Sequence, residues 1–176
     1  MSFKLTIHDD KGRVSISQNI RGSLGIGKGY VIQLEYLIDK ALIVSDYDVL
    51  DYQYRFQTTL AARKYFGLTY KDTFEANIFL LNESPIISLD YVLFKPGNDG
   101  RFYIPLKTRR LLSLDRHSSI SLDSVMTEDP NINKELLNSC PVVLDHQNRV
   151  KFCDEYGKIL RRLDWFTATV MKGGII

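Results

Sequence analysis

The chain contains a repeated segment. The stretch from Gly12, GRVSISQNIRGSLGIGKGYVIQLE, aligns without a gap with the stretch from Gly100, GRFYIPLKTRRLLSLDRHSSISLD. Aligned pairs include Gly12 with Gly100, Arg13 with Arg101, Ile16 with Ile104, Arg21 with Arg109 and Leu34 with Leu122. Recurrence in register over this length means that each copy must form the same supersecondary unit, so the repeat limits the possible folds severely.

Two further copies complete the chain. The second begins at Tyr54 with YRFQTTLAARKYFGLTYKDTFEA and lacks the leading glycine. The fourth is weaker: it begins at Asn148 with NRVKFCDEYGKILRRLDWFTATV, and it needs one inserted residue to bring Leu163 onto Ile26. Numbered by their starts at positions 12, 54, 100 and 148, the four repeats nearly exhaust the 176 residues.

Each repeat predicts the same series of elements, most clearly in the first. Alternating apolar and polar residues predict strands at 3–7 and 13–17. The turn between them ends at Gly12, because glycine tolerates the positive φ of a tight turn. A short helix is expected over 18–24, and Gly25 is placed where a helix end needs a left-handed residue.

The later parts of the repeat vary more. Gly67 takes the helix-end position in the second repeat, whereas the third departs from it with Ser113. The stretch 30–37 alternates again, and we expect it to pair with a strand at 41–46 across the turn at Asp39-Lys40.

A repeat of about 44 residues is close to the lower limit for independent folding. Two repeats must therefore share a core. The sequence predicts a mostly β protein with short helices, built as two small barrels in tandem. Repeats one and two would form the first over residues 1–84, and repeats three and four the second over 85–176, with a boundary near Glu83-Ser84-Pro85.

Composition favours a soluble, cytoplasmic protein. The two cysteines, Cys140 and Cys153, have no CxxC spacing, which favours a reducing compartment. The start, Met1-Ser2-Phe3-Lys4, lacks the apolar run of a signal peptide, and no stretch is long and apolar enough to span a bilayer. The net charge of +2 does not by itself indicate a polyanionic partner, so a basic surface requires clustering.

The motifs of the repeats suggest a family. The third repeat carries Gly100-Arg101 entering a strand, then Ile104-Pro105, then the helical pair Arg109-Arg110. The first repeat has Gly12-Arg13 and Leu24-Gly25-Ile26 in the same register. This pattern resembles the AbrB/MraZ/SpoVT swapped-hairpin family over nearly the whole chain. The resemblance implies four tandem units that form two pseudo-dimeric swapped-hairpin β-barrels and present arginines to DNA.

The chain also departs from that family's pattern. The glycine-aspartate that the family places after the helix is replaced by Gly29-Tyr30, Lys71-Asp72 and His117-Ser118 in the first three repeats. The fourth keeps only Arg149 and a basic helix over 158–162. The resemblance therefore leaves open whether each repeat retains its DNA contacts.

Arginine placement provides the candidate binding residues. All eleven arginines lie inside the repeat windows, and residues 87–176 carry thirteen basic and eleven acidic side chains against ten and ten in 1–86. Guanidinium groups suit phosphates and guanine edges. The predicted DNA-binding residues are Arg13, Arg21, Arg55, Arg63, Lys64, Arg101, Lys107, Arg109, Arg110, Arg149, Arg161 and Arg162. Alternatively these arginines are structural, pairing with aspartates or covering apolar edges with their stems.

Other kinds of site find little support in the sequence. The three histidines have no metal-ligand spacing, and the GxGxG at 25–29 follows a helix instead of opening one. Since nothing resembles a catalytic grouping, we expect no enzyme, no cofactor, no metal and no small-molecule substrate.

Two functions from different classes remain. The first is a DNA-binding transcriptional regulator whose partner is duplex DNA. The second is a protein–protein adaptor that kept the fold and lost DNA binding, which the near-neutral charge and the decayed fourth repeat favour. An antitoxin ranks lower, because only residues 171–176 follow the last repeat and a toxin-binding tail is expected. Self-association stays open.

Overall fold

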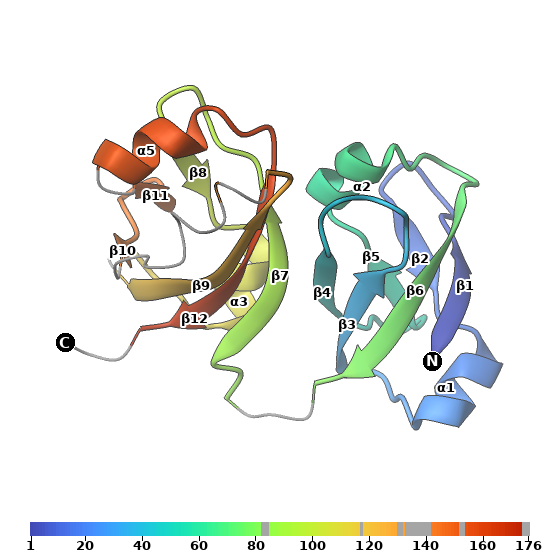
Figure 1. Ribbon diagram of the computed structural model, residues 1–176. Coiled ribbons are helices and arrows are strands. Elements are labelled where there is room, and N and C mark those ends of the chain that lie inside the picture. The colour runs from blue at the N-terminus through green and yellow to red at the C-terminus, as the bar shows by residue number, and fades with distance from the viewer. Residues whose placement is uncertain (82–84, 117, 130–131, 133–141, 152–153, 174–176) are drawn as a thin grey trace. The chain divides into compact units, whose positions relative to one another are not determined.

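The chain divides into two compact units, unit 1 (Met1–Ser84) and unit 2 (Pro85–Ile176). This division falls between the second and third repeats. The computed structural model describes residues 1–81, 85–116, 118–129, 132, 142–151 and 154–173 (Figure 1). Both cysteines, and with them the expectation about their state, lie outside these described residues.

Unit 1 follows the predicted series of elements. In chain order it forms β1 (Ser2–Thr6), β2 (Arg13–Ser15), α1 (Gln18–Leu24), β3 (Val31–Tyr36), β4 (Ser45–Val49), β5 (Arg55–Gln57), α2 (Leu60–Phe66) and β6 (Thr73–Leu80). Helix α1 has the predicted bounds. The pairing of β3 with a following strand is also confirmed, but β4 begins four residues later than predicted, because the connection first carries Leu42 and Val44 into the core.

The strands of unit 1 pair between repeats. Counted from the strand that precedes each start at position 12 or 54, the first repeat contributes β1, β2, α1 and β3, and the second contributes β4, β5, α2 and β6. The strand predicted at 41–46 as a later part of the first repeat therefore opens the second repeat. The main sheet has the order β1-β6-β3-β4, and β2 pairs with β5, all antiparallel. Each of these ladders joins one repeat to the other, and within a repeat the described strands meet at an isolated bridge between Ile7 and Val14. The two repeats therefore share one sheet.

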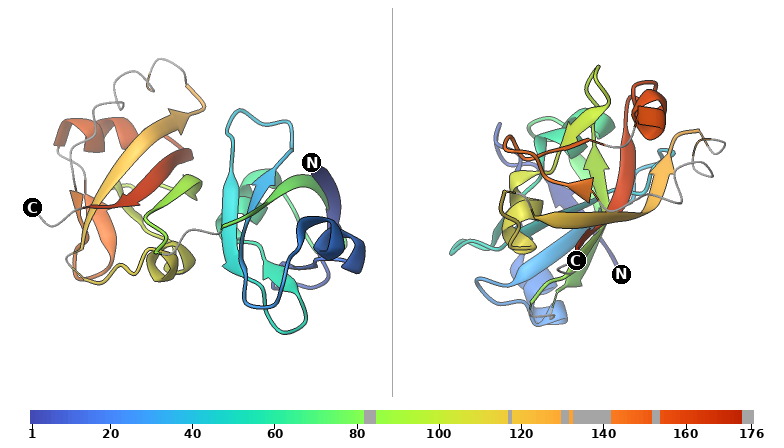
Figure 2. Two further views of the ribbon diagram at one scale, coloured as in Figure 1. Left: turned by 90° about the horizontal axis from the view of Figure 1, so that it is seen from below. Right: turned by 90° about the vertical axis from the view of Figure 1, so that its left-hand side faces the viewer.

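Unit 2 is built in the same way from repeats three and four. Its elements are β7 (Ser88–Phe94), β8 (Arg101–Tyr103), α3 (Leu106–Leu111), β9 (Ser119–Thr127), β10 (Val142–Val143), β11 (Arg149–Lys151), α5 (Asp154–Leu160) and β12 (Phe166–Lys172). The sheet order is β7-β12-β9-β10, and β8 pairs with β11. Helices α1 and α2 of unit 1 lie apart from one another, as do helices α3 and α5 of unit 2 (Figures 1 and 2).

Local sequence explains the helices. Ser17 and Thr59 cap α1 and α2, each accepting a hydrogen bond from a backbone N–H three residues on. Gly25 and Gly67 end these helices in the left-handed conformation, with φ of 65° and 70°. Ser113 takes the same conformation after α3, with φ of 50°, although it is not glycine.

Each unit has an aromatic cluster in its core. In unit 2 the rings of Phe94, Phe102 and Phe166 lie 4.9 to 5.1 Å apart, centre to centre, and all three side chains are buried. In unit 1, Tyr36 packs between Phe66 and Phe74 at 4.9 and 5.2 Å. Since repeats supply these rings jointly, neither repeat has a core of its own.

The predicted fold class is confirmed at its coarser level. The described part of the chain is mostly β, and its helices have six or seven residues. A closed barrel is not found among the described strands, because the strands at the ends of each unit's sheet, β1 and β4 or β7 and β10, do not pair with one another. Within the described residues no helix is long and apolar enough to cross a membrane.

Candidate nucleic-acid interface

The strand arginines lie on two short antiparallel ribbons. The ribbon β2·β5 carries Arg13 and Arg55, and the ribbon β8·β11 carries Arg101 and Arg149. In each strand the middle residue is buried, so the first and third residues point to the other face. The four arginines are therefore presented outward from equivalent positions.

An aspartate at the preceding turn binds each of these arginines. Asp51 accepts hydrogen bonds from the backbone N–H of Arg55 and from its guanidinium, at 2.9 and 2.7 Å. Asp145 binds Arg149 in the same way, with both distances 2.9 Å. Asp9 and Arg13 repeat this arrangement, and in the third repeat Asp99 and Arg101 form a looser pair at 3.5 Å. The turn thus orients the guanidinium before any ligand binds.

These contacts affect the acidity of the aspartates. Burial alone would raise the pKa of Asp9, Asp51 and Asp145. Hydrogen bonds from the backbone and guanidinium of the arginine four residues on outweigh it, so the pKa of each lies below the ordinary value of 3.8. All three carboxylates stay charged at neutral pH, and the arginines remain paired.

The residue before each strand arginine is left-handed in all four repeats. The φ values are 78° for Gly12, 57° for Tyr54, 74° for Gly100 and 58° for Asn148. The second repeat therefore keeps the turn geometry without its leading glycine. Conformation is better preserved here than residue type.

Two helix arginines pack against the turn of the other repeat in unit 1. The guanidinium carbon of Arg21 lies 3.7 Å from the ring centre of Tyr54. Arg63 donates to the carbonyl of Asp10 at 2.9 Å and lies against Gly12. The Nε atoms of both arginines are buried. These contacts favour the structural interpretation of Arg21 and Arg63, which were predicted to bind DNA.

The predicted basic residues on helix α3 of unit 2 differ from one another in exposure. Arg109 donates from Nε to the carbonyl of Ile104 at 3.2 Å, and Lys107 is half-buried in α3. Arg110 is exposed, as is Lys64 in α2 of unit 1. The predicted helical arginines thus divide into half-buried and exposed ones.

The prediction of a basic helix over 158–162 in the fourth repeat is wrong at the C-terminal end of the helix. Helix α5 ends at Leu160, so Arg161 and Arg162 lie in the turn that follows it. The helix instead presents Gly157 at the position of Arg63, and the carbonyl of Gly157 lies 2.5 Å from where a Cβ on Gly100 would be. A glycine there lets backbone approach backbone, which an arginine side chain would prevent.

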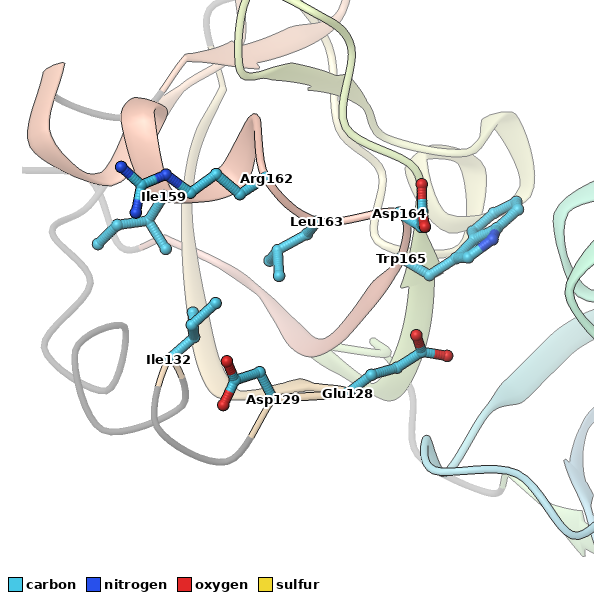
Figure 3. Close-up of a pocket in the computed structure, with 8 residues that line it drawn as sticks. All are labelled: Glu128, Asp129, Ile132, Ile159, Arg162, Leu163, Asp164 and Trp165. Atoms are coloured by element: carbon cyan, nitrogen blue, oxygen red, sulfur yellow. The ribbon is translucent and has the colours of Figure 1, made fainter.

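Arg162 also lines an acidic pocket. This pocket of unit 2, of about 540 Å³, is bordered by Glu128, Asp129 and Asp164 together with apolar side chains (Figure 3). Leu163 points into it, whereas Arg162 extends beside Ile159 (Figure 3). Three carboxylates beside one guanidinium disfavour a phosphate backbone here, so the structure supports Arg162 less as a DNA contact than it supports the strand arginines.

The outward positions of the two ribbons distinguish the units. Besides its arginines, β2·β5 presents Ser15 and Gln57. The equivalent residues of β8·β11 are Tyr103, 63% exposed, and Lys151, also exposed. Cross-strand pairing sets Lys151 opposite Arg101 and Tyr103 opposite Arg149. The ribbon of unit 2 thus carries three cations around an exposed aromatic ring.

A second pocket adjoins the ribbon of unit 2. Its volume is about 430 Å³, and Lys95, Arg101, Arg149, Tyr103 and Asp99 line it together with two residues of the 96–97 turn. Lys95 is exposed, and its Nζ lies 5.4 Å from the ring centre of Trp165. The pocket extends the basic surface of β8·β11 toward the end of β7.

The described residues contain no group of three or more histidine, cysteine, aspartate or glutamate side chains that could hold a metal ion. Comparisons of the chain with family models, with curated proteins and with solved structures found no match. The resemblance to the swapped-hairpin family therefore remains an expectation from the chain's own motifs.

Sequence reasoning missed two features of this surface. The first is the aspartate four residues before the arginine, which recurs in three repeats as Asp9, Asp51 and Asp145 and was visible in the alignment. The second is the pair Tyr103 and Lys151, at the alignment column two residues after the strand arginine. Attention to arginine alone concealed the recurring aspartate, and the column of Tyr103 and Lys151 differs in residue type between repeats, as Ser15 and Gln57 show.

Proposed function

We propose that the protein binds duplex DNA through unit 2, with the outer face of β8·β11 against the phosphate backbone. The observation that carries this proposal is the outward array of Arg101, Arg149 and Lys151 on one two-stranded ribbon. A ribbon of this kind fits the major groove of B-DNA, and cations along it can contact phosphates.

Local charge supports the choice of unit 2. Around its ribbon four cations, Lys95, Arg101, Arg149 and Lys151, face two carboxylates, Asp99 and Asp145. On the outward face of β2·β5, Arg13 and Arg55 face three carboxylates, Asp9, Asp51 and Asp48, and Asp48 accepts a hydrogen bond from the backbone of Gln57 at 2.9 Å. The neighbouring Arg21 and Arg63 pack against the turns of this ribbon, so the ribbon of unit 2 is the better candidate for binding a polyanion.

The internal pairing of the arginines is compatible with this function. A guanidinium has five N–H donors, and the side-chain hydrogen bond from Arg149 to Asp145 uses Nε. The remaining donors can reach a phosphate while the aspartate fixes the direction of the group, which reduces the side-chain entropy lost on binding.

We further propose that each unit is a covalent pseudo-dimer of the AbrB swapped-hairpin type. Its support is the interleaving of the ladders, in which β1 pairs with β6, β4 with β3, and β2 with β5. Exchanging the two repeats reverses the strand order of the sheet onto itself, as a pseudo-twofold arrangement requires. A regulator of transcription is the function that this resemblance implies.

The test is fluorescence anisotropy with a blunt duplex over a series of salt concentrations. Binding by the wild type is expected to weaken steeply with salt, and Arg101→Ala/Lys151→Ala is expected to lower the slope by about two phosphate contacts. The matched control is Arg13→Ala/Gln57→Ala, which changes the equivalent positions of unit 1 and is expected to leave binding unchanged. Absence of binding by the folded protein at low salt would refute the proposal.

A second candidate function is protein binding through unit 1. Among the described residues this unit exposes eight large apolar side chains beyond the terminal Met1: Tyr30, Leu37, Ile43, Val49, Tyr52, Leu60, Tyr70 and Phe79. Among its own described residues unit 2 exposes Ile87, Tyr103 and Leu106. An adaptor that lost DNA binding would use the apolar surface of unit 1, and it becomes the favoured function if no duplex binds.

A further inference from the structure

The pocket beside β8·β11 combines groups that recognise two parts of one ligand. Lys95, Arg101 and Arg149 line it, and the two arginines are paired with two carboxylates, Arg101 with Asp99 and Arg149 with Asp145. The surplus of positive charge suits a phosphate. Its volume of about 430 Å³ is within the range of small-molecule sites.

Tyr103 supplies the second element of recognition. Its side chain is 63% exposed and lines the same pocket. An exposed tyrosine ring beside phosphate-binding cations is the arrangement by which proteins hold unpaired nucleotides, because every base has a π-face that can stack. A paired base inside a duplex does not offer that face.

Unit 1 lacks this combination. The alignment of the first repeat with the third places Ser15 at the position of Tyr103 and the buried Ile7 at the position of Lys95. The pocket is therefore not an inevitable consequence of the shared fold, and its chemistry arises from residues that differ between the units.

We propose that this pocket binds one unpaired nucleotide, with its phosphate on Lys95, Arg101 and Arg149 and its base stacked on Tyr103. DNA with a single-stranded overhang would then bind more tightly than blunt duplex of the same sequence. The proposal rests on the proposed function, since it names the DNA form that the same surface of unit 2 prefers.

The experiment compares blunt duplex with the same duplex carrying a short run of unpaired thymidines, at one salt concentration. The overhang is expected to tighten binding roughly tenfold. Tyr103→Ala should remove this preference and Tyr103→Phe should keep it, because phenylalanine retains the stacking ring. Lys95→Ala should also reduce the preference for the overhang, because Lys95 is one of the three cations proposed to hold the phosphate. Both side chains are exposed, so the variants are expected to fold.

Thymidine monophosphate provides an independent arm. Because Lys95 lies over Trp165, the only tryptophan in the chain, nucleotide binding is expected to change tryptophan fluorescence in the wild type and not in Lys95→Ala. A response to thymidine monophosphate that inorganic phosphate reproduces fully would overturn the role of the base.

The outcomes separate the two proposals. Salt-dependent binding of blunt duplex without any gain from the overhang overturns the nucleotide pocket and leaves the proposed function standing. Binding of the overhang or of thymidine monophosphate, without binding of blunt duplex, supports the pocket and overturns the duplex function. Binding of none of these ligands overturns both, and an overhang preference that persists in Tyr103→Ala overturns the pocket.

Discussion

Unit 1 and unit 2 have the same strand order and similar arginine–aspartate turns, yet they differ in what covers the glycine before a strand arginine and in two outward residues of the ribbon. In unit 1 an arginine side chain, Arg63, covers the turn at Gly12. In unit 2 the backbone of Gly157 covers the turn at Gly100. The comparison teaches that topology is preserved in this chain while the chemistry at equivalent positions has diverged, so function should be assigned unit by unit.

Gly100→Ala is expected to have the largest effect. Both Gly12 and Gly100 have positive φ, but a Cβ on Gly100 would meet backbone atoms of Gly157, which cannot rotate away. We expect a loss of about 3 kcal/mol in the stability of unit 2. Urea unfolding followed by the fluorescence of Trp165, which lies in unit 2, measures it.

Two variants of unit 1 serve as controls, followed by circular dichroism. Gly12→Ala meets side-chain atoms of Arg63 and Thr58, which can partly move, so we expect a smaller loss of about 1–2 kcal/mol. Gly22→Ala meets nothing within 4 Å and improves helix propensity, so no loss is expected. Unfolding of Gly100→Ala at the wild-type urea concentration would contradict the close backbone packing of Gly157 on Gly100.

Ser113→Gly is expected to stabilise unit 2, whereas Gly100→Ala is expected to destabilise it. Ser113 adopts the left-handed conformation that glycine provides at Gly25 and Gly67 of unit 1. Glycine at this position removes the steric strain of the left-handed conformation, so the substitution is expected to stabilise unit 2 by about 1 kcal/mol. The reciprocal change Gly67→Ser should destabilise unit 1 by a similar amount. Urea unfolding measures both, and a stabilised Gly67→Ser protein would contradict the explanation.

Arg21→Ala tests whether the helix arginines of unit 1 are structural. Loss of the contact with the Tyr54 ring is expected to cost about 0.5–1 kcal/mol of stability, measured by urea unfolding. The affinity for duplex DNA, measured by anisotropy, is expected to change by less than about twofold. If DNA binding falls while stability is unchanged, Arg21 is a DNA contact and the structural interpretation fails.

The acid sensitivity of the turns is expected to be the smallest effect. The pKa of Asp51 and of Asp145 lies below 3.8 in the folded protein, so their contribution to stability is complete above about pH 4 and is lost as the pH falls through the lowered value. Asp145→Asn should reduce the acid dependence of unit 2, followed by tryptophan fluorescence, and Asp51→Asn that of unit 1, followed by circular dichroism. Acid profiles identical to the wild type would show that these pairs do not stabilise the turns.

Local features of the fold could be predicted from the sequence, and pairing between repeats could not. Ser17 and Gly25 mark the ends of α1, so its bounds were predicted correctly. The ladder between β1 and β6 joins residues about seventy positions apart, and alternation alone does not select a partner at that distance. The alignment gave the register of the repeats but not which repeat supplies the neighbouring strand.

The candidate site was predictable only in part. Arg101 and Arg149 were identified from the repeat, and they lie on one ribbon. Arg162 was grouped with them as part of the predicted basic helix over 158–162, yet α5 ends before it and the side chain lines an acidic pocket. Tyr103 and Lys95 join the site because the chain folds back at 96–100, which residue spacing does not reveal.

The most direct test of the DNA-binding proposal exchanges the outward residues of the two ribbons. Tyr103→Ser/Lys151→Gln gives unit 2 the pattern of unit 1, and Ser15→Tyr/Gln57→Lys gives unit 1 the pattern of unit 2. Both proteins would be titrated with blunt duplex at low salt by fluorescence anisotropy. If unit 2 binds DNA through its ribbon, loss of the Lys151 cation in the first exchange weakens duplex binding about tenfold, and the added cation in the second strengthens it severalfold. Wild-type affinity in both exchanges would contradict that assignment.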